Sequence, residues 1–195
     1  MSTLCFGGSF NPIHNGHLTC ARTVAAKLDF DRVLLIPSGL PPHKPAAADL
    51  AAAEHRLAMC RIVASADPLF QVTDLEIRRG GPSYTLQTAR ELKSFGMTTV
   101  NWLIGADMLN FLPMWHEAAK LLEEVNFIVI ARPGYPFEWT TLPKEFQVLR
   151  QHVVEAPLVN ICATEIRRKV RAGESIAGLI PSELETYIHQ HHLYR

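Results

Sequence analysis

The sequence predicts a Rossmann-like α/β fold, with a doubly wound, mostly parallel sheet and a small helical C-terminal part. Short apolar runs alternate along the chain with stretches of helical periodicity, which favours strands connected by helices. One of these runs, residues 33–36, is apolar on both faces, as a strand buried inside a parallel sheet requires. The length of 195 residues suits one compact domain spanning residues 1–195.

The first strand is expected over residues 3–6, a short apolar run near the start of the chain. A helix follows, because Leu18, Ala21, Ala25 and Leu28 recur at the spacing of one helical face. Between the two lies a segment rich in glycine and histidine. We therefore expect a strand, a short connection and a helix at the start of the domain.

The same alternation continues through the middle of the chain. Residues 32–37 contain the doubly apolar strand, and residues 50–66 show helical periodicity. Apolar and polar residues then alternate over residues 70–78, which predicts a strand with Glu76 among the side chains that point outward. The first half of the chain thus supplies three predicted strands.

The second half repeats the pattern of strands and helices. We expect, in order, a turn over residues 80–84, a helix to about residue 95, a strand over 100–104, a helix over 115–124, a strand over 125–131 and a last strand over 158–161. Residues 134–156 show no clear pattern. Thr164 can cap a helix that stops at Gly173, and Ser182 with Glu185 forms a capping-box pattern for a final helix.

Composition argues against several classes of protein. Lys and Arg together number 19, as do Asp and Glu, so no net charge attracts nucleic acid or an anionic membrane. The four cysteines form no C-x-x-C pair, which is typical of reduced thiols in the cytoplasm. No signal peptide is expected before the first strand, and no apolar run approaches membrane-spanning length. We expect a cytoplasmic protein that binds neither nucleic acid nor membrane.

The most informative segment covers residues 7–17 and reads GGSFNPIHNGH. It lies where the first strand meets the first helix, and amides at a helix N-terminus carry partial positive charge that suits phosphate. Gly7 and Gly8 let a ligand approach the backbone, and His14 and His17 face the same way on a first helical turn. The pair therefore suits a triphosphate. The structural alternative is that His14 caps the helix and His17 is a buried core histidine.

Four further groups place residues that suit phosphates or flat rings at strand ends and helix starts. Lys44 ends a proline-stiffened loop after the second strand and can reach a phosphate. Hydroxyls and amides over residues 83–85, together with the ring of Tyr84, can hold a planar heterocycle and its acidic group. Asp107 can accept hydrogen bonds from a ribose, and Trp115 can stack on a base or pyridine ring.

The fourth group is Thr164 with Arg167, where amides at a helix start form an anion nest and a guanidinium offers a planar fork for phosphate. Each group also has a plain structural alternative. Taken alone, Lys44 could be a solvated surface lysine. Residues 83–85 could form an ordinary helix cap, and Trp115 could be a core residue that anchors the packing. Arg167 alone reads as a surface arginine on a capped helix. Their common placement at one sheet edge is what favours a phosphate site.

In this order, the motifs resemble those of the bacterial nicotinate mononucleotide adenylyltransferases, a family of the nucleotidyltransferase superfamily with an HxGH signature. The matching segments cover essentially the whole chain: residues 7–17, 36–44, 82–85, 105–115, 132–134 and 162–167. One departure is Cys162, where the family often has a serine. A thiol is a weaker hydrogen-bond donor than a hydroxyl, so one small phosphate contact is in doubt.

The resemblance implies adenylyl transfer from ATP to nicotinate mononucleotide, giving deamido-NAD and pyrophosphate in NAD biosynthesis. It implies catalytic roles on the ATP phosphates for His14, His17 and Lys44. The residues expected to bind ATP are Gly7, Gly8, Ser9, Gly105, Asp107, Arg132, Thr164 and Arg167, and those expected to bind nicotinate mononucleotide are Tyr84, Thr85, Trp115 and His116. Mg²⁺ is expected to arrive with ATP, because the chain shows no dedicated carboxylate cage.

Several alternatives stay open. The acceptor could be nicotinamide mononucleotide or phosphopantetheine, although the motifs at Tyr84 and Trp115 favour a pyridine nucleotide. The chain could instead be a nucleotide-binding sensor without turnover, which the intact histidine pair argues against. His14, His17 and His43, or the histidines near the C-terminus, could hold a metal ion, but neither set has a cysteine or carboxylate at a usual ligand spacing. A homo-oligomer is compatible with the sequence.

Overall fold

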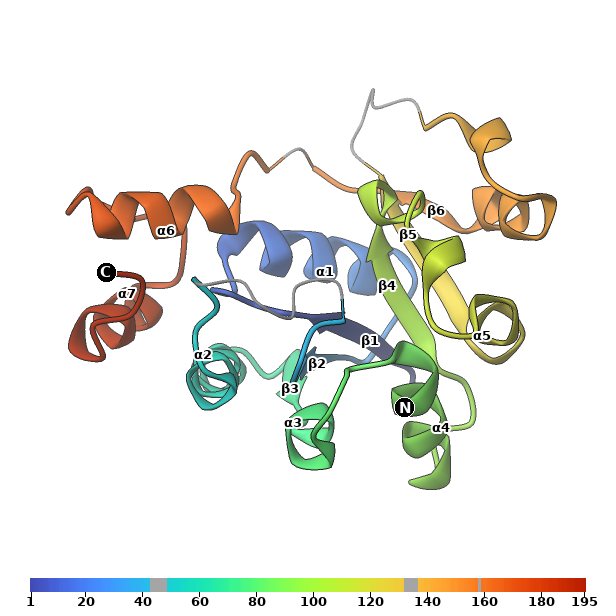
Figure 1. Ribbon diagram of the computed structural model, residues 1–195, viewed down its shortest axis with the longest axis horizontal. Coiled ribbons are helices and arrows are strands. Elements are labelled where there is room, and N and C mark those ends of the chain that lie inside the picture. Colours follow the sequence, from blue (N-terminus) through green and yellow to red (C-terminus); the bar gives the residue numbers. More distant parts are fainter. Residues whose placement is uncertain (43–48, 132–136, 158) are drawn as a thin grey trace.

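The protein, described by a computed structural model over residues 1–42, 49–131, 137–157 and 159–195, is built around a six-stranded sheet (Figure 1). The strands lie in the order β3-β2-β1-β4-β5-β6, and every neighbouring pair is parallel. They are β1 (Thr3–Gly8), β2 (Arg32–Pro37), β3 (Phe70–Val72), β4 (Asn101–Gly105), β5 (Asn126–Ala131) and β6 (Val153–Glu155). The predicted Rossmann-like α/β fold is confirmed.

Helices connect the strands and cover the sheet. The α-helices are α1 (Asn15–Lys27), α2 (Ala53–Ala66), α3 (Leu75–Arg79), α4 (Thr85–Ser94), α5 (Ala118–Glu124), α6 (Ala163–Arg171) and α7 (Ser182–Gln190). Short 3-10 helices are η1 (Ala106–Met108), η2 (Leu112–Met114), η3 (Trp139–Thr141) and η4 (Lys144–His152). Figure 1 shows α6 and α7 together at one end of the molecule, as the predicted helical C-terminal part. None of the helices in the described part of the chain has both the length and the hydrophobicity needed to cross a bilayer.

Two hydrophobic cores lie on opposite faces of the sheet, because successive strand residues point to opposite sides. Leu4 belongs to the core that includes residues of α1, α2, α6 and α7, whereas its neighbour Cys5 belongs to the core that includes α4, α5 and η4. Leu103 and Trp102 divide between the two cores in the same way. Burial on both faces is what the doubly apolar strand pattern predicts.

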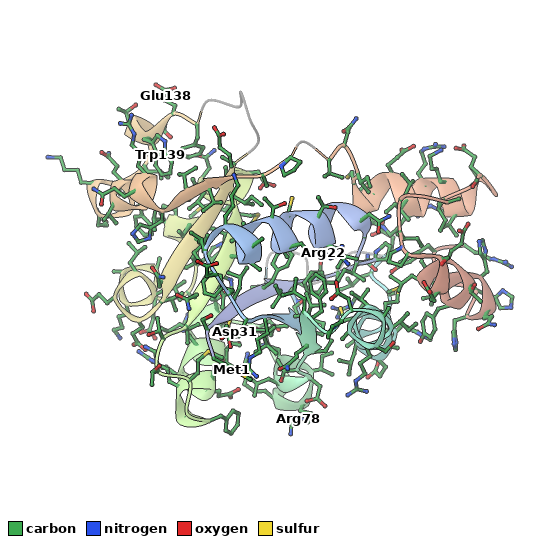
Figure 2. The ribbon with its side chains drawn as sticks, turned by 180° about the vertical axis from the view of Figure 1, so that it is seen from behind. Met1, Arg22, Asp31, Arg78, Glu138 and Trp139 are labelled. Atoms are coloured by element: carbon green, nitrogen blue, oxygen red, sulfur yellow. The ribbon has the colours of Figure 1, made fainter. Side chains whose placement is uncertain are left out.

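The strand order reverses between β1 and β4. The chain first adds β2 and β3 on one side of β1, then returns to place β4 on its other side. Such a reversal leaves a crevice at the carboxyl ends of the strands, where α/β folds bind ligands. Met1 and Asp31 lie at the amino ends of the strands, on the opposite side of the sheet from this crevice. They are beside each other just before β1 and β2, with the N-terminal ammonium 4.0 Å from the carboxylate (Figure 2).

The strand predicted over residues 70–78 is wrong in its second half. β3 ends at Val72, and residues 75–79 form α3. The Arg78 amide donates to the Asp74 carbonyl at 2.8 Å, which closes a helical turn. Glu76, expected to point outward, is only 4% exposed. A five-residue alternation of apolar and polar residues fits one helical turn as well as a short strand, so the pattern alone misleads here.

Three other boundaries differ from the prediction. The helix expected over residues 115–124 begins only at Ala118, because Glu117 takes left-handed backbone angles with φ 50°. The helix expected from residue 50 begins at Ala53. The last strand is β6, inside the segment without a clear pattern; Leu158 lies outside the described residues, and residues 159–161 form no strand.

The N-caps predicted for the last two helices, α6 and α7, are both wrong in detail. Cys162 rather than Thr164 is the N-cap of α6, so Thr164 lies inside the first turn. Ser182 is already the first residue of α7, and its hydroxyl donates to Glu183 instead of pairing with Glu185. The predicted stop is correct, since α6 ends just before Gly173, whose φ of 68° favours glycine.

Candidate functional site

A cavity of about 940 Å³ opens at the carboxyl ends of β1 and β4, where the strand order reverses. Every predicted site residue in the described part of the chain lines it: Gly7, Gly8, Ser9, His14, His17, Tyr84, Thr85, Gly105, Asp107, Trp115, His116, Thr164 and Arg167. Lys44 and Arg132, also predicted, lie outside the described residues. Segments that are far apart in the sequence therefore meet around one space, large enough for a nucleotide-sized ligand.

His14 and His17 form a reciprocal cap at the start of α1. The His17 amide donates to Nδ1 of His14 at 3.4 Å, and the His14 amide donates to Nδ1 of His17 at 3.3 Å. Their rings stack with centroids 3.7 Å apart. The structural alternative is thus correct for His14, which does cap the helix. Capping does not exclude a ligand role, because both rings also line the cavity.

Burial keeps both imidazoles neutral near pH 7. It lowers the pKa of His14 to about 4, and it lowers the pKa of His17 well below its usual range, with the neighbouring His14 adding to the effect. Because each Nδ1 accepts a backbone amide, the single proton of each neutral ring belongs on Nε2. The pair can therefore donate two hydrogen bonds to an anion without carrying charge of its own.

Aromatic packing explains why the last two residues of β1, Gly7 and Gly8, are glycines. A Cβ on Gly7 would collide with the indole of Trp102, which also lines the cavity. A Cβ on Gly8 would lie 3.1 Å from the ring of Phe10. The sequence indicated that these glycines admit a ligand, but it missed Trp102, which fills the space above Gly7. No local pattern links two residues so distant in the sequence.

Arg167 is already engaged by protein groups. Its Nε donates to the Asp49 carboxylate at 2.7 Å, Nη1 donates to the Asn11 carbonyl at 2.9 Å, and Nη2 contacts the Thr164 hydroxyl at 3.4 Å. The Arg167 bond lowers the pKa of Asp49 below its usual range. The open phosphate fork expected from the sequence is therefore closed here by Asp49, and a phosphate must share or displace that carboxylate.

The aromatic end of the cavity contains a stacked pair. The rings of Tyr84 and His116 lie 4.2 Å apart and nearly parallel. Thr85 is the first residue of α4, as expected for a helix-start amide. His116, however, precedes the start of α5 by two residues, so its amide is not at a helix start. Trp115 packs against the second core, which supports the core-anchor alternative, and still lines the cavity.

A buried polar group that the sequence did not indicate lies beside this end. The Thr88 hydroxyl donates to the Glu76 carboxylate at 2.6 Å, and burial raises the pKa of Glu76. Arg79 donates to the same Thr88 hydroxyl at 3.1 Å and to Glu91 at 3.1 Å. Glu76 also lines the cavity, next to Ser83 and Tyr84. The group was missed because the alternating pattern placed Glu76 on a strand.

Among the described residues, no three His, Cys, Asp or Glu side chains gather where they could hold a metal ion. His43, one member of the proposed set, lies outside the described residues. In the C-terminal set, the ring of His191 lies 4.2 Å from that of Tyr187 on α7. The hydroxyl of Tyr187 also bonds His55 of α2 at 2.9 Å. These contacts use His55 and His191 in packing between α2 and α7.

The chain is similar to several known proteins. Residues 5–169 match the cytidylyltransferase-like family. A protein from Roseiflexus sp. (strain RS-1), named as a probable nicotinate-nucleotide adenylyltransferase, is 39% identical over 191 residues, covering 97% of this chain and 96% of its own. A protein of the same name from Thermus thermophilus is 41% identical over 191 residues, covering 97% of each chain.

A solved structure of Plasmodium falciparum nicotinic acid mononucleotide adenylyltransferase complexed with NaAD superposes with a TM-score of 0.78, covering 100% of this chain and 98% of that one. At 20% identity, this likeness shows the fold alone. The family match spans most of the chain, and the relatives near 40% identity span nearly all of it. This chain therefore belongs to the cytidylyltransferase-like family.

Proposed function

We propose that the protein is an enzyme of NAD biosynthesis that transfers the adenylyl group of ATP to nicotinate mononucleotide, giving deamido-NAD and pyrophosphate. One observation carries the proposal: a single cavity gathers two neutral histidines at a helix start together with aromatic and hydroxyl groups at its other end. The names of the similar proteins from Roseiflexus and Thermus support the same reaction. So does the order of the sequence motifs.

The proposed reaction needs no protein nucleophile. A 5′-phosphate oxygen of nicotinate mononucleotide attacks the α-phosphorus of ATP, the bond to the bridging oxygen breaks, and its electron pair leaves with pyrophosphate. Catalysis then depends on alignment and on stabilising the charge that grows on the phosphates. His14 and His17 suit this role, since each neutral ring has an Nε2–H donor at the helix start.

The remaining roles follow the motifs. Lys44 completes the catalytic group on the ATP phosphates; the other ATP contacts are assigned to Gly7, Gly8, Ser9, Gly105, Asp107, Arg132, Thr164 and Arg167. The acceptor contacts are assigned to Tyr84, Thr85, Trp115 and His116. A carboxylate on the pyridine ring suits the amides at the start of α4. For Arg167, the assignment requires that phosphate compete with Asp49.

A divalent ion would enter the site with ATP. The described carboxylates around the cavity are spread out: Asp49 is paired with Arg167, Asp107 follows β4, and Glu76 is buried against Thr88. This donor set fits Mg²⁺ that would be held mainly by phosphate oxygens and water. When bound, Mg²⁺ neutralises negative charge on the phosphates.

A substrate panel tests the proposal. Purified protein is mixed with ATP, Mg²⁺ and one acceptor at a time, and pyrophosphate release is measured. Nicotinate mononucleotide should be preferred over nicotinamide mononucleotide by roughly tenfold to a hundredfold in kcat/KM, because helix-start amides favour a carboxylate over a neutral amide. Equal rates would remove the carboxylate argument. Turnover only with phosphopantetheine would replace the proposed acceptor, and ATP binding without turnover of any acceptor would favour a sensor.

Two properties complete the proposal. We place the protein in the cytoplasm and allow a homo-oligomer, on the sequence arguments given above. Light scattering coupled to size-exclusion chromatography measures the second directly.

A further inference from the structure

Arg56 of α2 is a buried cation held by three carbonyl groups. It is 1% exposed. Its Nε donates to the Ala51 carbonyl, its Nη1 to the Ser9 carbonyl and its Nη2 to the Gly39 carbonyl, each at 2.9 Å. None of the ion pairs among the described residues includes it, and burial lowers its pKa. A guanidinium in this setting is costly to bury, and its rigid planar fork is what allows three carbonyls to be bonded at once.

The three carbonyls come from three separate segments around the cavity. Ser9 follows β1 and lines the cavity just before the histidine pair. Gly39 follows β2, and Ala51 precedes α2. A single side chain therefore joins the segments that leave β1 and β2 to the start of its own helix.

The segments at Gly39 and Ala51 make further hydrogen bonds to other residues around the cavity. The Gly39 amide donates to the Ser83 hydroxyl at 2.9 Å, and Ser83 adjoins Tyr84 and Thr85 at the aromatic end of the cavity. A Cβ on Gly39 would lie 2.7 Å from the Glu76 carbonyl oxygen, so this backbone is closely confined. Gly39 thus connects Arg56 to the end assigned to the acceptor.

On the other side, the Ala51 amide donates to the Asn11 side-chain oxygen at 3.0 Å, and the Asn11 side-chain amide donates to the Asp49 carbonyl at 2.9 Å. Asn11 in turn accepts a bond from Arg167 through its backbone carbonyl. Arg56 is therefore linked, by three hydrogen bonds through Ala51 and Asn11, to the guanidinium assigned to the triphosphate.

We propose that Arg56 is a positioning residue that fixes the ATP side of the cavity relative to the acceptor side. It touches neither substrate; it holds Ser9 and Gly39 in register, so that the attacking phosphate lies in line with the α-phosphorus. This inference rests on the proposed function. Its chemical basis is the fork of three donors, which an ammonium group on a flexible stem cannot reproduce.

The test compares Arg56→Lys with Arg61→Lys, the same substitution on the same helix at an arginine that is 62% exposed and lies 3.6 Å from Asp74. Arg56→Lys should lower kcat by roughly tenfold to a hundredfold, the effect of a small misalignment of reactants, and leave both KM values within about threefold of wild type. Arg61→Lys should match wild type in all three constants. A purely structural role would instead lower the active fraction and the thermal midpoint together.

Amide hydrogen exchange gives a second readout that needs no turnover. In Arg56→Lys, the amides of Gly39 and Ala51 should exchange at least about tenfold faster, while amides of β4 and β5 keep their wild-type rates. If wild type turns over no acceptor, the proposed function fails, and this exchange pattern still decides the role of Arg56. Unchanged exchange at both amides, or kcat within about twofold of wild type in the folded variant, overturns the inference.

A milder variant covers the case in which Arg56→Lys does not fold. Ser83→Ala removes the hydroxyl that accepts the Gly39 amide and that also bonds the Glu76 side chain, and it leaves the three bonds of Arg56 in place. It should raise the KM of the acceptor several-fold, leave the KM of ATP unchanged and speed exchange of the Gly39 amide. Wild-type acceptor KM and wild-type exchange at Gly39 would show that this chain of contacts does not position the acceptor.

Discussion

Acid should destabilise this protein through His14, and one substitution should remove that effect. His14 is 6% exposed, and burial lowers its pKa from 6.5 to about 4. Above pH 7 the ring is neutral in both the folded and the unfolded chain, so it adds nothing to the pH dependence of stability. As the pH falls through 6.5, the unfolded chain takes up a proton that the folded chain cannot, and the free energy of unfolding falls until about pH 4.

The size of the effect follows from the two pKa values. At pH 5 the unfolded ring is almost fully protonated and the folded ring mostly neutral, so stability should be lower by about 2 kcal/mol than at pH 8. His14→Asn supplies the comparison, because asparagine is a favoured N-cap that can still accept the amide of His17 but does not titrate.

Urea unfolding of wild type and His14→Asn at pH 8, 7 and 5 measures the difference. Between pH 8 and pH 7 the two proteins should change alike, which serves as the internal control. Between pH 7 and pH 5, wild type should lose about 2 kcal/mol more than the variant. Equal losses over this interval would falsify the view that burial holds His14 neutral.

Three further substitutions should have defined effects. His17→Ala should lower turnover, measured as pyrophosphate release, by roughly two to three orders of magnitude, the usual effect of removing one donor to a transition state; a rate near wild type would exclude the proposed role. Arg167→Lys keeps the charge but loses the fork that bonds Asp49, so the KM of ATP should rise roughly tenfold. Unchanged ATP kinetics would place this guanidinium outside the phosphate site. Gly39→Ala should cost about 1–3 kcal/mol in urea unfolding, because its Cβ would press on the Glu76 carbonyl, and wild-type stability would contradict that packing.

The overall fold could be predicted because its signals are local. The run over residues 33–36 is apolar on both faces, and only a strand with helices on both sides of its sheet buries it fully. Prediction failed where a pattern was too short to be unique. Residues 74–78 alternate like a strand but close a helical turn, and β6 has only three residues at the edge of the sheet.

The site could be predicted only in part, for a related reason. The motif residues lie at strand ends and helix starts, and parallel strands bring those positions to one edge. Charged residues that are paired by tertiary contacts cannot be recognised from their position in a strand or helix. Asp49 and Arg167, for example, are separated by 118 residues of sequence. Arg56 likewise appears in the sequence as one more charged residue of an amphipathic helix. Its role depends on carbonyl groups, and every residue type has one.

The reciprocal histidine cap has a consequence for how this protein can be stabilised. Serine or aspartate at position 14 is the usual choice for a stronger helix start. Aspartate there would place a negative charge where the proposed reaction needs a donor, and serine would remove the ring that stacks on His17. With the proposed role of His14, the N-cap of α1 cannot be exchanged for serine or aspartate without loss of activity. Gains must come from other helix starts, such as α2, whose N-cap Ala52 makes no side-chain capping bond and is assigned to neither substrate.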